Sequence, residues 1–225
     1  MPYLHLVRHG QPDFAGDYDS LTTLGAQQSR WLGEHFAMRG LRFARVASGT
    51  LRRQADTCDW ILQQVADAPE PVRDARYNEY DHASLLAFFE GRDPVALRAT
   101  GDRRLYFTAI RHALQQWARH DGALDNDGET WAGFGDRILR GVADLCAGLG
   151  RDENVLIVTS GGVIGRYAAL SVGADAQVAI QLNLQTRNTG VTEIVRTPGG
   201  ATRLVAFNAV PHLEARGRET AVTFS

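Results

Sequence analysis

Short apolar runs alternate with longer amphipathic segments along this chain, a pattern typical of strands joined by helices. Residues 4–7, 43–47 and 155–159 are predicted to be buried strands. The run 155–159 is apolar and largely β-branched, which indicates a central strand covered on both faces. Near the C-terminus, segments 191–195 and 203–207 flank Thr197-Pro198-Gly199-Gly200, which predicts a hairpin at a sheet edge.

Amphipathic segments between these strands predict helices. One begins near Thr23, and another follows the second strand with its buried face at positions 55, 58, 62 and 65. Residues 69–76 are predicted to be a loop, and residues 84–120 a group of short helices broken near Gly91 and Gly101. A polar linker is expected at 121–128, followed by a helix that opens at Glu129-Thr130-Trp131.

This order of elements predicts an α/β fold, a three-layer sandwich with a mostly parallel central sheet flanked by helices. We expect a single domain spanning residues 1–225, with a small helical cap inserted at about residues 80–128. A chain of 225 residues is long enough to bury a sizeable core without disulfides or metals.

Charge and cysteine content narrow the class of protein. A formal net charge of −2 argues against a general nucleic-acid or membrane-surface binder. Cys58 and Cys146 lie in helical patterns without metal-ligand spacing and are expected to be buried thiols in a reducing compartment. No apolar run approaches the roughly 18 residues of a membrane span. We therefore expect a cytoplasmic protein that binds neither nucleic acid nor membranes.

The first strand ends in Arg8-His9-Gly10, a combination suited to holding an oxyanion. Arginine offers a planar fork to phosphate or carboxylate, and glycine lets the backbone approach closely. The imidazole can act as a base, an acid or a nucleophile. Arg53 lies in the first turn of the helix after the second strand, which is a related position. Because the carboxyl ends of parallel strands share one edge of a sheet, both arginines are expected there.

The central strand ends in Ser160-Gly161-Gly162 and leads into a further helix. A strand, a turn of small residues and a helix N-terminus can cradle an anion with backbone N–H groups. Ser160 could instead be a hydrolase nucleophile at a sharp strand–helix turn. The glycine that such an elbow requires two residues earlier is replaced by Val158, which argues against this alternative.

Taken together, these motifs resemble the histidine phosphatase superfamily, which has the phosphoglycerate-mutase-like fold. The opening Leu6-Val7-Arg8-His9-Gly10-Gln11 is similar to the superfamily's first motif, and Leu21-Thr22-Thr23-Leu24-Gly25 resembles its first helix. Ser48, Leu51, Arg53 and Thr57 fit its second motif, and Asn78-Glu79 resembles the segment with its acidic residue. Gly128-Glu129-Thr130 and residues 208–213 resemble further segments of the superfamily.

This resemblance implies roles for individual residues. His9 would be the nucleophile that forms a phosphohistidine, and Arg8 and Arg53 would clamp the phosphoryl oxygens. Glu79 would protonate the leaving alcohol, with Glu129 as the rival acid. Gln11, Ser160 and Gly161 would bind the substrate, a small phosphorylated molecule. Phosphoryl transfer needs positioning and charge neutralisation, which two arginines can supply without a metal or other cofactor.

Two departures from the superfamily pattern affect the expected activity. Ser160 stands where a second catalytic histidine is normal, and losing such a donor typically slows an enzyme by a factor of about 10²–10³. His82 and His212 are candidates to refill its place. The loop Gln11-Pro12-Asp13-Phe14 lacks the polar pattern of the mutases, so a phosphatase is favoured. The alternative is a catalytically impaired, phosphate-binding pseudophosphatase.

Overall fold

The computed structural model describes residues 1–120, 122, 128–197 and 199–224. Across these residues, six strands form one sheet in the order β3-β2-β4-β1-β5-β6. The strand bounds are β1 Tyr3–Arg8, β2 Phe43–Ser48, β3 Val72–Arg73, β4 Asn154–Thr159, β5 Val191–Arg196 and β6 Thr202–Ala209. The first four strands run parallel, while β5 and β6 are antiparallel and form the edge hairpin. The expected mostly parallel sheet with β4 at its centre is confirmed; Pro198 of the hairpin turn lies outside the described residues.

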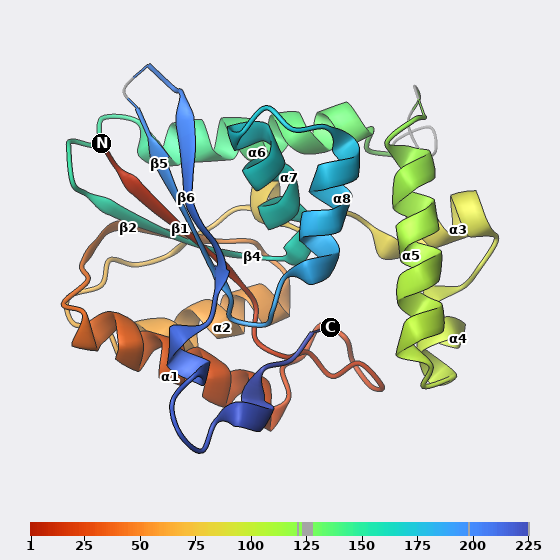
Figure 1. Ribbon diagram of the computed structural model, residues 1–225, viewed down its shortest axis with the longest axis horizontal. Coiled ribbons are helices and arrows are strands. Elements are labelled where there is room, and N and C mark those ends of the chain that lie inside the picture. The colour runs from red at the N-terminus through yellow and green to blue at the C-terminus, as the bar shows by residue number, and fades with distance from the viewer. Residues whose placement is uncertain (121, 123–127, 198, 225) are drawn as a thin grey trace.

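Helices cover both faces of this sheet (Figure 1). Their bounds are α1 Thr23–Met38, α2 Arg52–Leu62, α3 His82–Glu90, α4 Pro94–Ala99, α5 Arg103–Trp117, α6 Trp131–Cys146, α7 Gly161–Ser171 and α8 Ala176–Gln185. Three short 3-10 helices are η1 Ala75–Tyr77, η2 Pro211–Leu213 and η3 Glu219–Ala221. Helices α1 and α2 lie on one face, and α6 and α7 lie on the other with α8 packed against α7. The α/β sandwich predicted from the sequence is confirmed.

Alternation along the strands divides the core between the two faces. Leu4 and Leu6 of β1 point to the side of α6 and α7, whereas Val7 points to the side of α1 and α2. Residues 155–158 of β4 alternate in the same way and are fully buried, as expected of a central strand. Cys58 and Cys146 are buried free thiols. None of the helices in the described parts of the chain has the length and apolar character needed to cross a bilayer.

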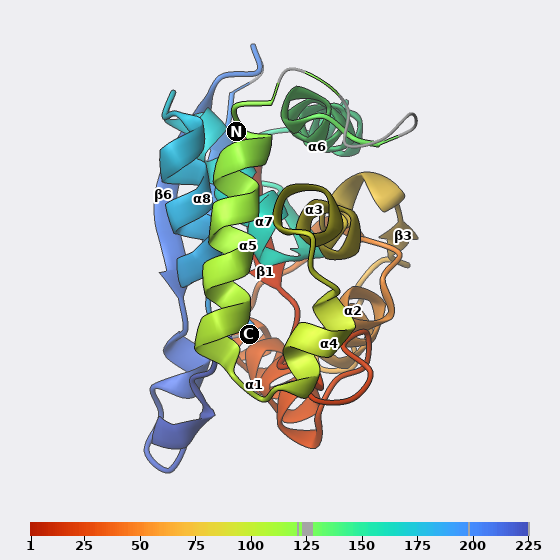
Figure 2. The ribbon, with the colours of Figure 1, turned by 90° about the vertical axis from the view of Figure 1, so that its right-hand side faces the viewer.

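Helices α3, α4 and α5 stand together beside the sandwich, at one end of the sheet (Figure 2). Helix α5 packs against α3 and α8, so this helical lobe rests on the body of the fold. In the predicted linker 121–128, which follows α5, residues 121 and 123–127 lie outside the described residues. The helical breaks expected near Gly91 and Gly101 are confirmed, since both glycines lie between helices at positive φ.

Two elements differ from the expectations. The predicted loop 69–76 contains β3, a two-residue edge strand whose side chains are exposed, and most of η1. The helix after β2 ends at Leu62, although Val65 still packs into the core as expected. Both side chains of β3 are exposed, so no apolar alternation marks this strand in the sequence.

The parallel strands end at one level, which determines where the loops meet. Arg8 of β1 pairs with Thr159 of β4, and Ser48 of β2 pairs with Val158. The next backbone amide in each case continues the ladder, with His9 donating to Thr159 at 2.8 Å and Gly49 donating to Val158 at 3.1 Å. Helices α2 and α7 both begin at this edge, so the segments expected to carry the chemistry converge there.

Candidate active site

A narrow pocket opens at this carboxyl edge of the sheet, beneath the helical lobe. Its wall combines the two predicted arginines, the predicted histidine and the predicted acid with side chains from α5 and α8. The lining residues are Arg8, His9, Tyr18, Arg53, Glu79, Tyr80, His82, Phe107, Ile110, Asn183 and Leu184. The structure thus brings together His9, Arg8, Arg53 and Glu79, which are distant in sequence.

His9 lies at the base of the pocket with only 1% of its surface exposed. Its Nδ1 is 2.8 Å from the carbonyl oxygen of Gly10, an acceptor, so Nδ1 carries the proton and donates it. The other ring nitrogen, Nε2, accepts from Nε of Arg53 at 3.3 Å. Burial, and then the charges of Arg53 and Arg8, hold the pKa of His9 well below its ordinary value. The imidazole is therefore neutral, and its lone pair lies on Nε2, the ring nitrogen that faces Arg53.

Gly10 allows the close packing that fixes His9. A Cβ at Gly10 would lie 2.4 Å from the carbonyl oxygen of Gly25 in α1, so any larger residue would push the strand end away. The amide of Gly10 donates to Oγ1 of Thr57 at 2.9 Å, and that hydroxyl donates to the carbonyl of Arg53 at 2.7 Å. Thr57 thereby links the end of β1 to the first turn of α2, which carries Arg53.

Arg53 is held by a carboxylate that the sequence analysis did not single out. Its Nη1 donates to Oδ1 of Asp19 at 2.8 Å, and Asp19 also accepts from the backbone amide of Arg52 at 3.0 Å. The N-cap residue of α2, Leu51, has no capping side chain, so Asp19 caps this helix from the loop after β1. That cap places a carboxylate beside an arginine that would otherwise oppose the helix dipole.

Arg8 reaches toward the end of α8. Its Nη1 donates to the carbonyl of Thr186, the C-cap of that helix, at 2.5 Å. A helix C-terminus carries partial negative charge, which suits a guanidinium. Burial lowers the pKa of Arg8, but an arginine stays protonated in proteins. The pocket therefore holds two fixed positive charges around the neutral His9.

Glu79 lies across the pocket and accepts two backbone hydrogen bonds. Its Oε2 accepts from the amide of Gly162 at 3.0 Å, and its Oε1 accepts from the amide of Tyr80 at 3.3 Å. A Cβ at Gly162 would lie 2.1 Å from Oε1, so glycine is required for this approach. Burial raises the pKa of Glu79, against the opposing effects of the Gly162 amide and both arginines. A carboxyl with a raised pKa can hold a proton for donation.

The rival acid lies elsewhere. Glu129 is held by Arg137, whose Nε is 2.6 Å from Oε1, and it does not line the pocket. Of the two candidate acids, Glu79 is thus the one that lines the pocket with His9, Arg8 and Arg53.

The residues predicted to bind substrate lie outside the pocket lining. Oε1 of Gln11 accepts from the Thr22 hydroxyl at 2.9 Å. Ser160 is fully buried, and its Oγ accepts from Nε2 of Gln54 at 2.7 Å. A Cβ at Gly161 would lie 2.6 Å from Oγ1 of Thr186, so this glycine allows α7 to pack against the end of α8.

The two histidines considered as replacements for a second catalytic histidine lie in different places. His212 is buried near the end of α1, where its Nε2 is 2.8 Å from Oγ1 of Thr189, and it does not line the pocket. His82, the first residue of α3, does line the pocket.

Several pocket residues were missed by sequence reasoning. Asn183 of α8 donates to the hydroxyl of Tyr80 at 3.0 Å, and both side chains line the pocket with Tyr18. A neighbouring hollow is lined by Arg98 of α4, whereas Arg103 of α5 donates to the backbone of Phe224. Isolated polar residues in loops and cap helices carry no sequence pattern that marks them as functional.

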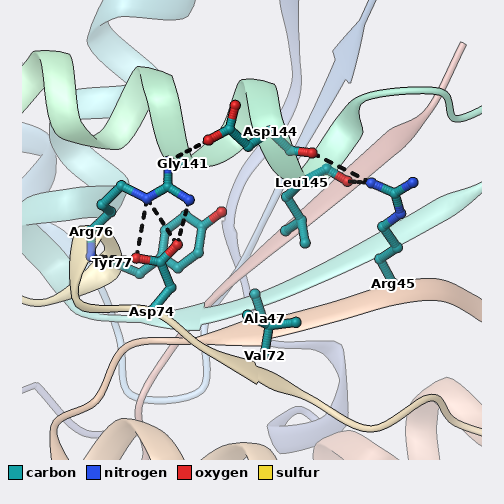
Figure 3. A pocket seen from close by; sticks show the side chains of 9 residues that line it. All are labelled: Arg45, Ala47, Val72, Asp74, Arg76, Tyr77, Gly141, Asp144 and Leu145. Atoms are coloured by element: carbon teal, nitrogen blue, oxygen red, sulfur yellow. Dashed lines mark hydrogen bonds and ion pairs between the residues drawn. The ribbon is translucent and has the colours of Figure 1, made fainter.

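A separate hollow lies between α6 and the β2–β3 edge, and it lacks the chemistry of the pocket around His9 (Figure 3). Arg76 at one end pairs with Asp74 at 2.7 Å and Asp144 at 2.6 Å. Arg45 at the other end donates to the carbonyl of Leu145 at 2.8 Å. Both guanidinium groups are committed to holding α6 against the sheet, and no histidine lines this hollow. Within the described ranges, no group of three or more His, Cys, Asp or Glu residues could hold a metal ion.

Comparison with known proteins identifies the family of this site. Residues 4–210 match the family model of the histidine phosphatase superfamily (branch 1). The chain belongs to the histidine phosphatase superfamily. Among curated members, a 2,3-bisphosphoglycerate-dependent phosphoglycerate mutase of Mesorhizobium japonicum is 28% identical over 201 residues, covering 80% of this chain and 92% of the mutase.

Solved structures support the fold of this superfamily member. Bacillus stearothermophilus YhfR is 23% identical, with a TM-score of 0.71 over 95% of this chain and 100% of that one. Phosphoserine phosphatase of Entamoeba histolytica, solved with 3-phosphoglyceric acid, is 21% identical, with a TM-score of 0.66 over 95% and 100% of the two chains. Identities this low establish a common fold and leave the substrate of this superfamily member to be argued from its own residues.

Proposed function

We propose that this chain is a cytoplasmic phosphatase that hydrolyses a small phosphomonoester through a phosphohistidine on His9, without a metal. The observation that carries the proposal is the placement of a neutral imidazole, with its Nε2 directed at Arg53, between two arginines and a buried carboxyl. These groups supply a nucleophile, charge neutralisation and an acid, which phosphoryl transfer requires.

His9, Glu79 and the two arginines have separate roles in the proposed reaction. Nε2 of His9 attacks phosphorus while the bond from phosphorus to the ester oxygen breaks, and protonated Glu79 delivers its proton to that oxygen. Water then attacks the phosphohistidine, Glu79 takes a proton from the water, and the bond from phosphorus to Nε2 breaks. Phosphate leaves with Glu79 again protonated. Arg8 and Arg53 neutralise the phosphoryl oxygens in both steps.

The loop after β1 supports hydrolysis over a mutase reaction. Phe14 is 6% exposed, and its ring packs against Tyr106 of α5, with ring centres 5.4 Å apart. Phe107 and Ile110 of the same helix line the pocket. Around Phe14 the loop thus meets the cap through ring packing, and Phe14 offers no polar group to the second phosphate that a bisphosphorylated intermediate carries.

The direct test is incubation of the protein with a nitrophenyl phosphate and with a panel of phosphorylated metabolites. We expect release of phosphate and a phosphoenzyme that is stable to alkali and labile to acid, as a phosphoramidate is. Interconversion of phosphoglycerates in the presence of 2,3-bisphosphoglycerate, faster than their hydrolysis, would show a mutase instead. Phosphate binding with no turnover at any pH would show a pseudophosphatase. The lack of turnover would then be attributed to Ser160, which is buried and bound to Gln54.

Glu79 provides a separate prediction through its pKa. The acid must be protonated for the first step, so the rate on an alkyl phosphate is expected to fall as pH rises through the raised pKa of Glu79. Glu79→Gln should remove that alkaline limb and lower kcat by about 10²–10⁴-fold. With a nitrophenyl phosphate, whose leaving group needs no proton, the variant should give a burst of nitrophenol followed by slow turnover. The matched variant Glu129→Gln is expected to behave as wild type on both substrates; a loss there would transfer the acid role to Glu129.

A further inference from the structure

His82 projects into the pocket from the start of α3. Its ring stacks on Tyr80, with centres 4.8 Å apart and an interplanar angle of 30°. It lines the pocket together with His9, Arg8 and Arg53, and it lines the adjoining hollow that leads toward Arg98. The imidazole is therefore fixed by stacking at the place where a phosphorylated molecule would enter.

The hydrogen bond between His82 and Tyr106 fits a tautomer with the proton on Nε2. Nδ1 lies 2.8 Å from the hydroxyl of Tyr106, which can donate to it. In that tautomer Nε2 carries the imidazole proton, and an anion bound at Nε2 selects it.

The Nε2–H of His82 has no protein partner. Nε2 is buried, and no hydrogen-bond acceptor reaches it among the described residues. A buried donor without a partner costs about 1–3 kcal/mol, so a group that binds in the pocket and accepts from it gains that energy back. A phosphoryl oxygen is such an acceptor, and the pocket holds the two arginines that would bind the same group.

Ser160 is poorly placed for this role. It stands where the superfamily resemblance implies a second histidine, yet its hydroxyl is fully buried and bound to Gln54. Nothing in the pocket lining beyond the arginines, His82 and the amide of Asn183 offers a side-chain N–H to an anion. We propose that His82 donates its Nε2–H to a nonbridging phosphoryl oxygen and fills the role that Ser160 leaves open. This inference rests on the proposed phosphatase function.

The neutral state of His82 suits that role. Burial, and then the nearby charges of Arg53 and Arg98, lower its pKa to about 3. The imidazole thus contributes a hydrogen bond without adding a third full charge beside Arg8 and Arg53.

Two substitutions of His82 separate the donor from the ring. In His82→Gln the side-chain amide reaches the position of Nε2 and can still donate, whereas in His82→Asn it reaches only the position of Nδ1. We expect His82→Asn to lower kcat/KM by about 10²-fold, the effect of removing one donor to developing charge. His82→Gln should retain most of the activity. The control is His112→Ala, which removes an exposed histidine of α5 and should behave as wild type.

Binding of inorganic phosphate, measured by calorimetry, makes the test independent of turnover. Weaker binding to His82→Asn than to His82→Gln supports the proposal even if the chain is a pseudophosphatase. Equal binding and equal kcat/KM in both variants and wild type overturn it, while turnover that still depends on His9 upholds the phosphatase. Should either variant fold poorly, a ¹H–¹⁵N spectrum of histidine-labelled wild type decides: the Nε2–H signal of His82 shifts on adding phosphate, and an unchanged signal refutes the contact.

Discussion

Replacing His9 by alanine is expected to abolish phosphatase turnover, with kcat falling by at least about 10⁴-fold, or roughly 5 kcal/mol. The variant has no atom that can form the phosphoenzyme, and water alone is a poor nucleophile toward a phosphomonoester. Steady-state release of phosphate from an alkyl phosphate measures the loss. The alkali-stable, acid-labile phosphoenzyme should disappear with the activity.

Phosphate binding is expected to survive in His9→Ala. Thr186 holds Arg8, and Asp19 holds Arg53 in addition to the hydrogen bond that Arg53 makes to the imidazole, so both guanidinium groups should keep their positions. Calorimetry with inorganic phosphate should therefore give an affinity near that of wild type, which separates loss of chemistry from loss of the site. Full activity in the variant, or an acid-stable phosphoester on Ser160, would show that another residue is the nucleophile.

Sequence reasoning found the elements whose burial produces a strong pattern. Residues 155–158 are apolar throughout because β4 lies between β2 and β1 with helices on both faces, and the run 155–159 was predicted to be central. The helix predicted to open at residues 129–131 is α6, and its spaced apolar side chains Phe134, Ile138 and Val142 are buried against the sheet. A helix or strand that buries one face and exposes the other to solvent has regularly spaced apolar residues in its sequence.

Elements with little burial were missed for the same reason. Strand β3 is an exposed two-residue edge. Helix α8 buries only Ala179 and Ile180, and its apolar residues 178, 180, 182 and 184 alternate as they would in a strand. Its helical state comes from the Asp175 cap, which accepts from the amide of Val178 at 3.0 Å, and from packing on α7. Neither is visible as a period of 3.6 residues.

The centre of the candidate site could be predicted because topology determines it. Once the strands are parallel, residues that follow their carboxyl ends must meet at one edge, and the structure brings Nε of Arg53 within 3.3 Å of Nε2 of His9. The supporting groups could not be predicted. Asp19 reaches Arg53 from a loop, and Gln54, a polar residue that would ordinarily be exposed on a helix, is fully buried and bound to Ser160. Such contacts depend on tertiary packing, which leaves no local pattern.

The second large effect is expected at Arg53, for which the neighbouring Arg52 is a matched control. Arg53→Ala should lower kcat/KM by about 10³–10⁵-fold, as removal of an arginine that stabilises a phosphoryl transition state does. Arg53→Lys keeps the charge but loses the planar fork and the Nε–H directed at His9, so its loss should be smaller, about 10²–10³-fold. Arg52 pairs with Asp17 and Asp56 at 3.6 Å on the surface, and Arg52→Ala should behave as wild type.

Comparing Arg52→Ala with Arg53→Ala separates a direct contact between Arg53 and the phosphoryl group from a general effect of positive charge. Arg52→Ala and Arg53→Ala remove the same charge from the same first turn of α2, so equal losses in both would mean that only net charge matters and that Arg53 does not contact the phosphoryl group. The pH profile gives a second readout of position. Because the charge of Arg53 lowers the pKa values of His9 and Glu79, Arg53→Ala should raise both. Since the acid works in its protonated form, the alkaline limb of the residual activity should move to higher pH, whereas Arg52→Ala should leave it in place.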